Sequence, residues 1–313
     1  MYKRSIAFII CTICAVIFVN CALEHPFRPI NIDTTVNSVK SFDEFPEDTF
    51  DVIVYGSSHA WCGIDTGMLY EKYGISGYNY GCAWQHVNTT KLFLQDSLRY
   101  HTPKVVILET DMLTSPLADT EMCGEIYYSK GVGGWREKWD YLRQCFGNKL
   151  SRYIGYFLPT IVFHENWKNL TTESFMENSN DHDFVSSRGY LGSSSVEAVT
   201  IKKYEDLPQV PIPEDTLKFL DEMVEICRQR GITVILCTLP FGGIYEYPYG
   251  EALKAYAEQN NLCYINYYEK MDELNMDGDN DFRDEEHLNN SGAKKVMNDI
   301  GRYLCDKTGL GAK

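Results

Sequence analysis

The sequence predicts an α/β fold in which helices cover both faces of a central parallel sheet of about five strands. Short apolar runs alternate with segments of helical spacing over roughly residues 50–110, and the same alternation resumes near Pro211. Such runs are typical of parallel strands buried on both faces, and right-handed crossovers place the intervening helices on the sheet. With 313 residues and 44% hydrophobic content, the chain has enough material for one such domain with an insertion.

The N-terminus is predicted to carry an export signal. Lys3 and Arg4 precede an almost unbroken apolar run over residues 6–19, a pattern typical of a signal peptide or of a short signal anchor. The residues around Cys21 offer no clean small-x-small cleavage site and make a poor lipoprotein motif, which favours a retained anchor over residues 1–23. Positive charge before the run predicts that the remaining chain is extracytoplasmic, anchored to the cell membrane or secreted if the leader is cleaved.

The body of the chain is predicted to be a tether followed by one domain. Residues 24–48 hold three prolines among polar residues, which suits a tether, and the domain is expected to span residues 49–311. The expected strands cover residues 51–55, 77–80, 104–109, 232–237 and 262–266. The expected helices run from Asn88, as N-cap, to about Tyr100, from Pro213 to an end at Gly231, over 251–258, and over 291–304.

Residues 112–210 interrupt the alternation and are predicted to be an inserted, aromatic-rich cap. The insertion leaves the sheet at the carboxyl end of the third strand, the edge at which open α/β folds bind ligands. Its large aromatic residues are Tyr127, Tyr128, Trp135, Trp139, Tyr141, Tyr153, Tyr156 and Trp167. Such rings can stack on sugars, but burial in a small core of the insertion is the expected role of most of them.

Charge and cysteine usage narrow the possible partners. The formal net charge of −15 repels a phosphate backbone, so nucleic acid is not an expected partner, and any polyanionic substrate needs a locally basic site. Eight of the eleven cysteines follow the leader and permit disulfides outside the cytoplasm. The cysteines after the leader include no CxxC pair, and the acidic run 277–281 has its glycine out of register for a calcium loop, so neither a metal nor another cofactor is expected.

Two segments carry residues suited to acyl transfer. Ser58 stands in Gly-Ser-Ser-His directly after the first strand, where its hydroxyl would lie at the carboxyl edge of the sheet. Far along the chain, Asp284 and His287 lie three residues apart before the last helix, a spacing that lets the carboxylate orient the imidazole. Each segment alone is compatible with an ordinary turn, but together they supply a nucleophile, a base and an orienting carboxylate.

Both segments resemble the SGNH/GDSL esterase and acyltransferase superfamily. The family places a Gly-Asp-Ser block after its first strand and an Asp-x-x-His block before its C-terminal helix, which match Ser58, Asp284 and His287. The resemblance covers about residues 50–110 and 211–305 and implies a flavodoxin-like three-layer SGNH-hydrolase fold with these three residues as catalytic triad. The serine at position 57, where the family has aspartate, is typical of the cell-envelope branch, which includes the lipoteichoic-acid D-alanylation protein and the alginate O-acetylation enzymes.

The oxyanion hole departs from the family pattern. The second-block glycine, a backbone N–H donor, falls near Gly81 or Trp84, and the sequence does not decide between them. At the third-block asparagine this chain has Thr110 and Asp111, and an ionised aspartate cannot donate a hydrogen bond. His59 is a candidate substrate contact or a structural neighbour of the nucleophile.

Arg188 is a candidate positive charge at the site, with a surface ion pair as the ordinary alternative.

The resemblance to the envelope branch implies transfer or removal of a small acyl group, such as O-acetyl, on a cell-envelope glycan through an acyl-enzyme. The expected partners are an acylated glycan or other acyl donor and a membrane-bound O-acyltransferase. Two alternatives stay open: a free-standing carbohydrate esterase or lipase-like hydrolase with the same triad, and a non-catalytic assembly or binding protein with a degenerate site.

Overall fold

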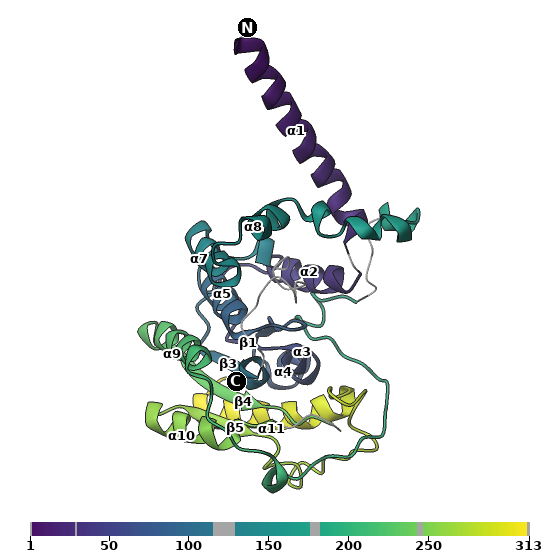
Figure 1. Ribbon diagram of the computed structural model, residues 1–313. Coiled ribbons are helices and arrows are strands. Elements are labelled where there is room, and N and C mark those ends of the chain that lie inside the picture. Colours follow the sequence, from purple (N-terminus) through teal and green to yellow (C-terminus); the bar gives the residue numbers. More distant parts are fainter. Residues whose placement is uncertain (1, 29, 115–128, 176–181, 243–246, 312–313) are drawn as a thin grey trace.

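The computed structural model describes residues 2–28, 30–114, 129–175, 182–242 and 247–311. At its centre lies a five-stranded sheet in the order β2-β1-β3-β4-β5, with every neighbouring pair parallel (Figure 1). The strands are β1 (Val52–Tyr55), β2 (Gly77–Asn79), β3 (Val105–Glu109), β4 (Thr233–Thr238) and β5 (Cys263–Asn266). The predicted α/β fold with a parallel sheet of about five strands is confirmed, and the strand order is that of flavodoxin-like folds.

Helices cover both faces of the sheet, so the domain has three layers. Alternate residues of β1 point to opposite faces: Ile53 and Tyr55 join one apolar cluster, and Val52 and Val54 join another. The first cluster lies under α5 (Val87–Ser97), α9 (Glu214–Gln229) and α10 (Gly250–Asn260). The second lies under α3 (Ser58–Gly63), α4 (Thr66–Tyr73) and α11 (Asn290–Thr308). The continuous apolar strands of the sequence are thus explained by burial on both sides.

Helix ends follow local chemistry with small departures from the prediction. Helix α9 begins after Pro213 as predicted, and Gly231 follows its end with φ +70°, a conformation that glycine adopts without strain. Helix α5 begins at Val87, so His86 rather than the predicted Asn88 is its N-cap residue. Within the part of the chain that the structure describes, no disulfide joins two cysteines, and Cys237 is buried.

Helix α1 (Tyr2–Phe27) projects away from the body of the protein (Figure 1). Within its segment Lys3–Phe27, an 18-residue window has a mean hydropathy of 2.7, and only 6% of that window is buried inside the protein. A helix of this length and composition can cross a bilayer. A signal sequence near an N-terminus has the same properties.

The segment predicted to be a tether is largely helical and partly buried, so that prediction was wrong for most of its length. Residues up to Phe27 continue α1, and α2 spans Ile30–Phe42. The Phe42 ring stacks on Tyr80 with centroids 4.3 Å apart, and the Tyr78 hydroxyl donates to the carbonyl of Ser38 at 2.7 Å. The sequence pattern did not indicate α2 because polar residues outnumber apolar ones along it, and the rings that it packs against come from β2 and the turn after it.

Phe42→Ala is expected to lower the free energy of unfolding by about 3–5 kcal/mol, the usual cost of truncating a buried phenylalanine. Urea unfolding of the full-length protein in detergent, followed by circular dichroism, measures the change. Lys40→Ala on the exposed side of the same helix is the matched control and should stay within about 0.5 kcal/mol of the parent. Equal stability of both variants would show that α2 is a dispensable linker.

The described part of the insertion has two different roles. Helices α7 (Trp135–Phe146) and α8 (Leu150–Phe157) contribute Tyr141 and Tyr156 to the main core rather than to a separate one. Trp135, Trp139 and Trp167 are exposed. The expectation that the aromatic side chains of the insertion are mostly buried was therefore wrong for these three. Tyr153 is half-buried. The predicted Tyr127 and Tyr128 lie outside the described residues.

Candidate active site

Ser58 lies at the point where the strand order of the sheet reverses. Strand β1 ends at Tyr55, the chain turns at Gly56, and Ser58 is the first residue of α3. The Ser57 hydroxyl accepts a hydrogen bond from the backbone N–H of His59 at 3.2 Å and so caps the helix. A β-carbon at Gly56 would come within 2.6 Å of the Glu109 β-carbon, so only glycine permits this close approach of β1 and β3.

The second segment is a tight loop fixed at its base by buried polar groups. Asp281 is fully buried and accepts hydrogen bonds from the Ser291 hydroxyl at 2.7 Å and the Lys295 ammonium at 2.6 Å. Asn289 caps α11 through its side-chain oxygen, which accepts from the backbone of Ser291 and Gly292. The loop between these anchors therefore has little freedom to move His287.

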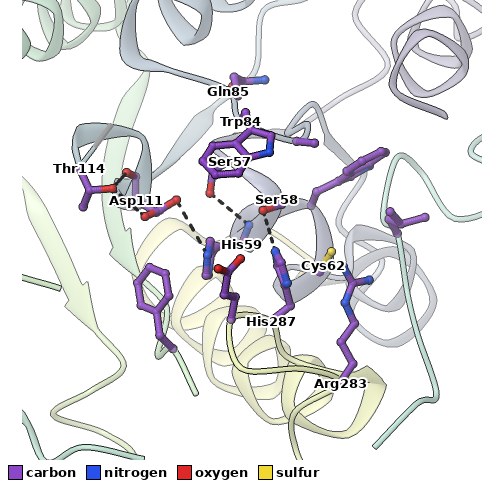
Figure 2. Close-up of a pocket in the computed structure, with 15 residues that line it drawn as sticks. Ser57, Ser58, His59, Cys62, Trp84, Gln85, Asp111, Thr114, Arg283 and His287 are labelled. Carbon is purple, nitrogen blue, oxygen red and sulfur yellow. Dashed lines mark hydrogen bonds and ion pairs between the residues drawn. The ribbon is translucent and has the colours of Figure 1, made fainter. Parts of the chain in front are cut away.

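Ser58, His287 and Asp284 form a connected chain of hydrogen bonds. The Ser58 Oγ lies 2.7 Å from His287 Nε2, and His287 Nδ1 lies 2.9 Å from Asp284 Oδ1. Figure 2 shows the serine hydroxyl directed at the imidazole. This order of nucleophile, base and carboxylate is the arrangement that serine-dependent acyl transfer requires.

Asp284 is held as a carboxylate. Partial burial on its own raises the pKa of Asp284, but the backbone N–H groups of Glu286 and His287 donate to its Oδ1 at 2.8 and 2.7 Å, and the His287 imidazole adds a further contact. Together these donors leave the pKa of Asp284 below its ordinary value. A charged carboxylate at Nδ1 favours the tautomer in which Nε2 is free to accept the Ser58 proton.

An extended strap from the insertion joins the two segments. The backbone N–H of Leu191 donates to the carbonyl of Trp61 in α3 at 2.9 Å. Two residues later, Ser193 accepts through its carbonyl from the backbone N–H of Asn290 at 2.8 Å. The strap thus fixes the distance between the helix that carries Ser58 and the loop that carries His287.

His59 is a buried neutral neighbour of the base. Burial lowers the pKa of His59 to about 4, although the nearby Asp111 carboxylate acts in the opposite direction. Its ring lies against the ring of His287, with centroids 4.9 Å apart, and its Nε2 is 4.0 Å from Asp111 Oδ2. Because His59 is uncharged near neutral pH, it does not oppose a positive charge on His287.

Glu109, at the end of β3, lies directly beneath the nucleophile turn. The backbone N–H groups of Asp111 and Ser57 donate to its carboxyl group at 2.9 and 3.4 Å. Burial, followed by the proximity of Asp111, raises the pKa of Glu109 well above its usual range despite these donors. The turn therefore rests on a carboxyl group that is more readily protonated than an ordinary glutamate.

Glu109→Gln is expected to weaken the pH dependence of the free energy of unfolding. In the parent, this free energy should fall as the pH rises. Because the pKa of Glu109 is higher in the folded than in the unfolded chain, its contribution to the free energy of unfolding is complete below the unfolded pKa and is lost as the pH rises through the folded pKa. Urea unfolding from about pH 5 to about pH 8 should give a flatter pH dependence for the variant than for the parent. The exposed Glu285→Gln serves as control, and parallel curves for parent and Glu109→Gln would contradict the assignment.

The structure separates the two candidate oxyanion donors. Gly81 does not line the pocket, and its backbone N–H donates to the Asn79 side chain at 3.0 Å, so its prediction as a donor was wrong. Trp84 does line the pocket, with φ +55° and a side chain that is 59% exposed at the mouth. Asp111 also lines the pocket, but its backbone N–H is used by Glu109.

Arg188 lies outside the pocket, so its predicted place at the site was wrong. Its guanidinium covers the Tyr70 ring at 3.9 Å from the centroid and donates to the Ser76 hydroxyl at 3.3 Å. Its carbonyl accepts from the backbone N–H of Asn79 at 2.9 Å, so the residue fastens the strap to the edge strand β2. The local sequence Ser-Ser-Arg-Gly, which contains Arg188, gave no indication of these partners.

The pocket contains residues that the sequence did not single out. It encloses about 230 Å³ and is lined in part by Arg283, Phe241 and Gln85 (Figure 2). Arg283 directly precedes Asp284 in the sequence, and only this adjacency could have indicated that Arg283 lines the pocket. Gln85 is structural: its side chain accepts from the Gly56 N–H at 3.2 Å and donates to the Tyr80 carbonyl at 2.9 Å.

Comparison with known proteins gives only distant likenesses. No family model and no curated protein matches the chain. A candidate acylhydrolase from Bacteroides fragilis NCTC 9343 is 14% identical with a TM-score of 0.43, and the alignment covers 87% of this chain and 94% of that one. A GDSL-like lipase from Bacteroides thetaiotaomicron VPI-5482 is 12% identical with a TM-score of 0.42, covering 87% and 98%. Likeness at this level assigns no activity to this chain.

Proposed function

We propose that this chain is an SGNH-type serine esterase or O-acyltransferase that forms an acyl-enzyme at Ser58. The observation that carries the proposal is the 2.7 Å contact between Ser58 Oγ and His287 Nε2, joined to the 2.9 Å contact between His287 Nδ1 and Asp284 Oδ1. The two segments are 229 residues apart along the chain, yet they meet with the geometry of a nucleophile and its base.

The reaction proceeds in two balanced steps. His287 Nε2 accepts the Ser58 proton while the serine oxygen bonds to the acyl carbonyl carbon, and the same proton then passes to the departing alcohol oxygen. A second hydroxyl, from an acceptor sugar or from water, loses its proton to His287 and attacks the acyl-enzyme. The proton returns to Ser58 as the acyl group leaves, and Asp284 stays ionised throughout.

The oxyanion is stabilised at the start of α3. The backbone N–H of Ser58 belongs to the first turn, where helix N–H groups have no intrahelical acceptor, and it adjoins the reacting oxygen. The neutral His59 and the backbone near Trp84 also line the pocket. Asp111 remains an acceptor only, so this site works without the side-chain amide of the family pattern.

A small acyl group fits the dimensions of the pocket. The cavity of about 230 Å³ is smaller than the usual range for drug-sized ligands, about 300–1,000 Å³. Phe241 and Leu191 supply apolar walls, while the exposed Trp84 ring at the mouth can stack on a sugar. These features support an O-acetyl or similar ester on a glycan as substrate.

The proposed location is the outer face of the cell membrane, with α1 as anchor and an envelope glycan as substrate. The apolar helix α1 and the two basic residues at its start support this orientation. An acyl donor is then delivered by a membrane-bound O-acyltransferase, as in the envelope branch that the sequence resembles.

Simple hydrolysis is the second candidate, and the pocket walls favour it. From the described part of the insertion, only Thr114 and Leu191 line the pocket, while α7 lies against α5 on the other side of the sheet (Figure 1). Helix α7 therefore does not exclude water from the pocket. An acyl-enzyme that is open to water is hydrolysed unless an acceptor hydroxyl competes with water.

Labelling with a fluorophosphonate probe tests the proposal. The intact detergent-solubilised protein should be labelled at Ser58, as shown by peptide mass spectrometry, because the probe reacts with a serine activated by its base. The neighbouring Ser57→Ala is the matched control and should keep its label. Acetate release from an O-acetylated oligosaccharide, with and without an acceptor sugar, then separates hydrolysis from transfer.

Absence of labelling in folded protein would count against both enzyme functions. It would favour the non-catalytic assembly or binding role. Unchanged function of Ser58→Ala in the source cell would support the same conclusion.

A further inference from the structure

A short segment after α8 packs alongside the apolar part of α1. It comprises η3 (Pro159–Ile161), with Leu158 before it, followed by η4 (His164–Asn169), and both contact α1 (Figure 1). An apolar groove of about 330 Å³ lies between the two, lined on α1 by residues from Thr12 to Asn20 and on the segment by Leu158, Thr160 and Ile161. The groove therefore follows about 12 Å of the helix that is long enough to cross a bilayer.

The polar side chains at this contact are paired with each other. Asn20 is buried, and its side-chain oxygen accepts from the Thr160 hydroxyl at 2.8 Å and from the Thr160 backbone N–H at 3.3 Å. An amide side chain without a partner is costly in hydrocarbon. Thr160 thus supplies donors at the end of the apolar run, where α1 would otherwise carry a polar group into lipid.

Backbone N–H groups of the segment also form hydrogen bonds within the protein. The N–H groups of Leu158, Ile161 and Val162 donate to carbonyls at 2.8, 3.0 and 2.9 Å. Phe163 donates to the Pro159 carbonyl at 2.9 Å, and Pro159 itself has no N–H. Non-helical backbone is tolerated at membrane depth only when its polar groups are satisfied within the protein, and these N–H groups meet that condition.

Apolar side chains next to the groove point to the outside. In α8, Leu150, Ile154 and Phe157 follow helical spacing and are all exposed, whereas Tyr156 on the opposite side is buried. From the last residue of η3 onward, the exposed apolar residues are Ile161, Val162, Trp167 and Phe175. A stripe of this kind, continuous with a spanning helix and containing tryptophan, is typical of a membrane interface.

We infer that residues 150–175 form an interfacial collar that inserts into the outer leaflet beside α1, so that the domain lies on the bilayer rather than hanging from it. The lipid surface is the occupant of the exposed stripe, and an acyl chain of a phospholipid fits the groove between η3 and α1. The collar accounts for three observations together: the exposed apolar side chains, the paired Asn20 and the satisfied backbone of η3.

Photo-crosslinking of the full-length protein in phospholipid nanodiscs tests the collar. The photoreactive residue p-benzoylphenylalanine replaces Phe157 or Ile161, both of which are exposed, so the fold is not disturbed. The same residue at Ile9 in α1 is the positive control, and at Val210, exposed but on the body of the domain, the negative control. After irradiation, mass spectrometry measures the yield of phospholipid adducts at each position.

The collar predicts adduct yields at positions 157 and 161 that are within about threefold of the yield at position 9 and at least about tenfold above that at position 210. Yields at 157 and 161 equal to the yield at 210 would overturn the inference, as would adducts to another protein in place of lipid. Absence of lipid adducts at position 9 would also overturn the inference, because α1 would then not lie in the bilayer. None of these outcomes depends on catalysis.

Discussion

Ser58→Ala is expected to lower turnover of an O-acetylated oligosaccharide or of p-nitrophenyl acetate by roughly 10³–10⁶-fold, the range over which loss of a triad nucleophile reduces catalysis. The reason is that Ser58 supplies the hydroxyl that lies 2.7 Å from His287 Nε2, whereas the neighbouring Ser57 hydroxyl accepts from the His59 N–H. Initial rates of acetate release by parent and variant measure the effect.

Ser57→Ala is the matched control for this prediction. It removes the N-cap of α3 and should cost about 1 kcal/mol of stability while leaving the nucleophile in place. A Ser58→Ala protein that keeps more than about a tenth of the parent rate would show that the contact with His287 is structural and not catalytic.

Asp284→Asn is expected to reduce the turnover number by about 10⁴-fold, because an amide in place of the carboxylate no longer favours the imidazole tautomer with a free Nε2. The side-chain oxygen of asparagine can still accept from the backbone of Glu286 and His287, so the loop should keep its shape. The unfolding midpoint in urea, measured beside the rate, separates loss of chemistry from loss of structure.

The exposed Glu285→Gln, one residue away, controls for charge removal from the same loop and should leave the rate unchanged. A normal rate with Asp284→Asn would contradict the assigned role of the carboxylate. A large drop in the unfolding midpoint with Asp284→Asn would instead indicate that the residue mainly builds the loop.

The sheet and the meeting of Ser58, His287 and Asp284 could be predicted because both depend on local sequence. Five apolar runs mark five strands to within one residue at each end, since strands buried on both faces leave a continuous pattern. Ser58 after the first strand and Asp284 with His287 before the last helix follow from motif spacing, and a parallel sheet brings its carboxyl ends to one edge.

What the sequence did not predict depends on contacts between distant segments. Gly81 has a suitable position along the chain, but the Asn79 side chain takes its N–H. Arg188 contacts Tyr70 because of the path of the strap, which has no periodic pattern in the sequence. The second helix was missed because the rings that surround its Phe42 come from other elements.

His287 lies 229 residues after Ser58 along the chain, so the proposed base is synthesised well after the proposed nucleophile. A chain exported before translation ends would hold its nucleophile for some time without the partner that activates it. The His287 loop can take its place only when α11 has docked against α3 and α4. Premature termination ahead of residue 284 would therefore leave a sheet with most of its strands and helices formed but with an inert hydroxyl. Under the proposed function, Ser58 therefore becomes reactive only after the segment that carries His287 has been synthesised and has folded.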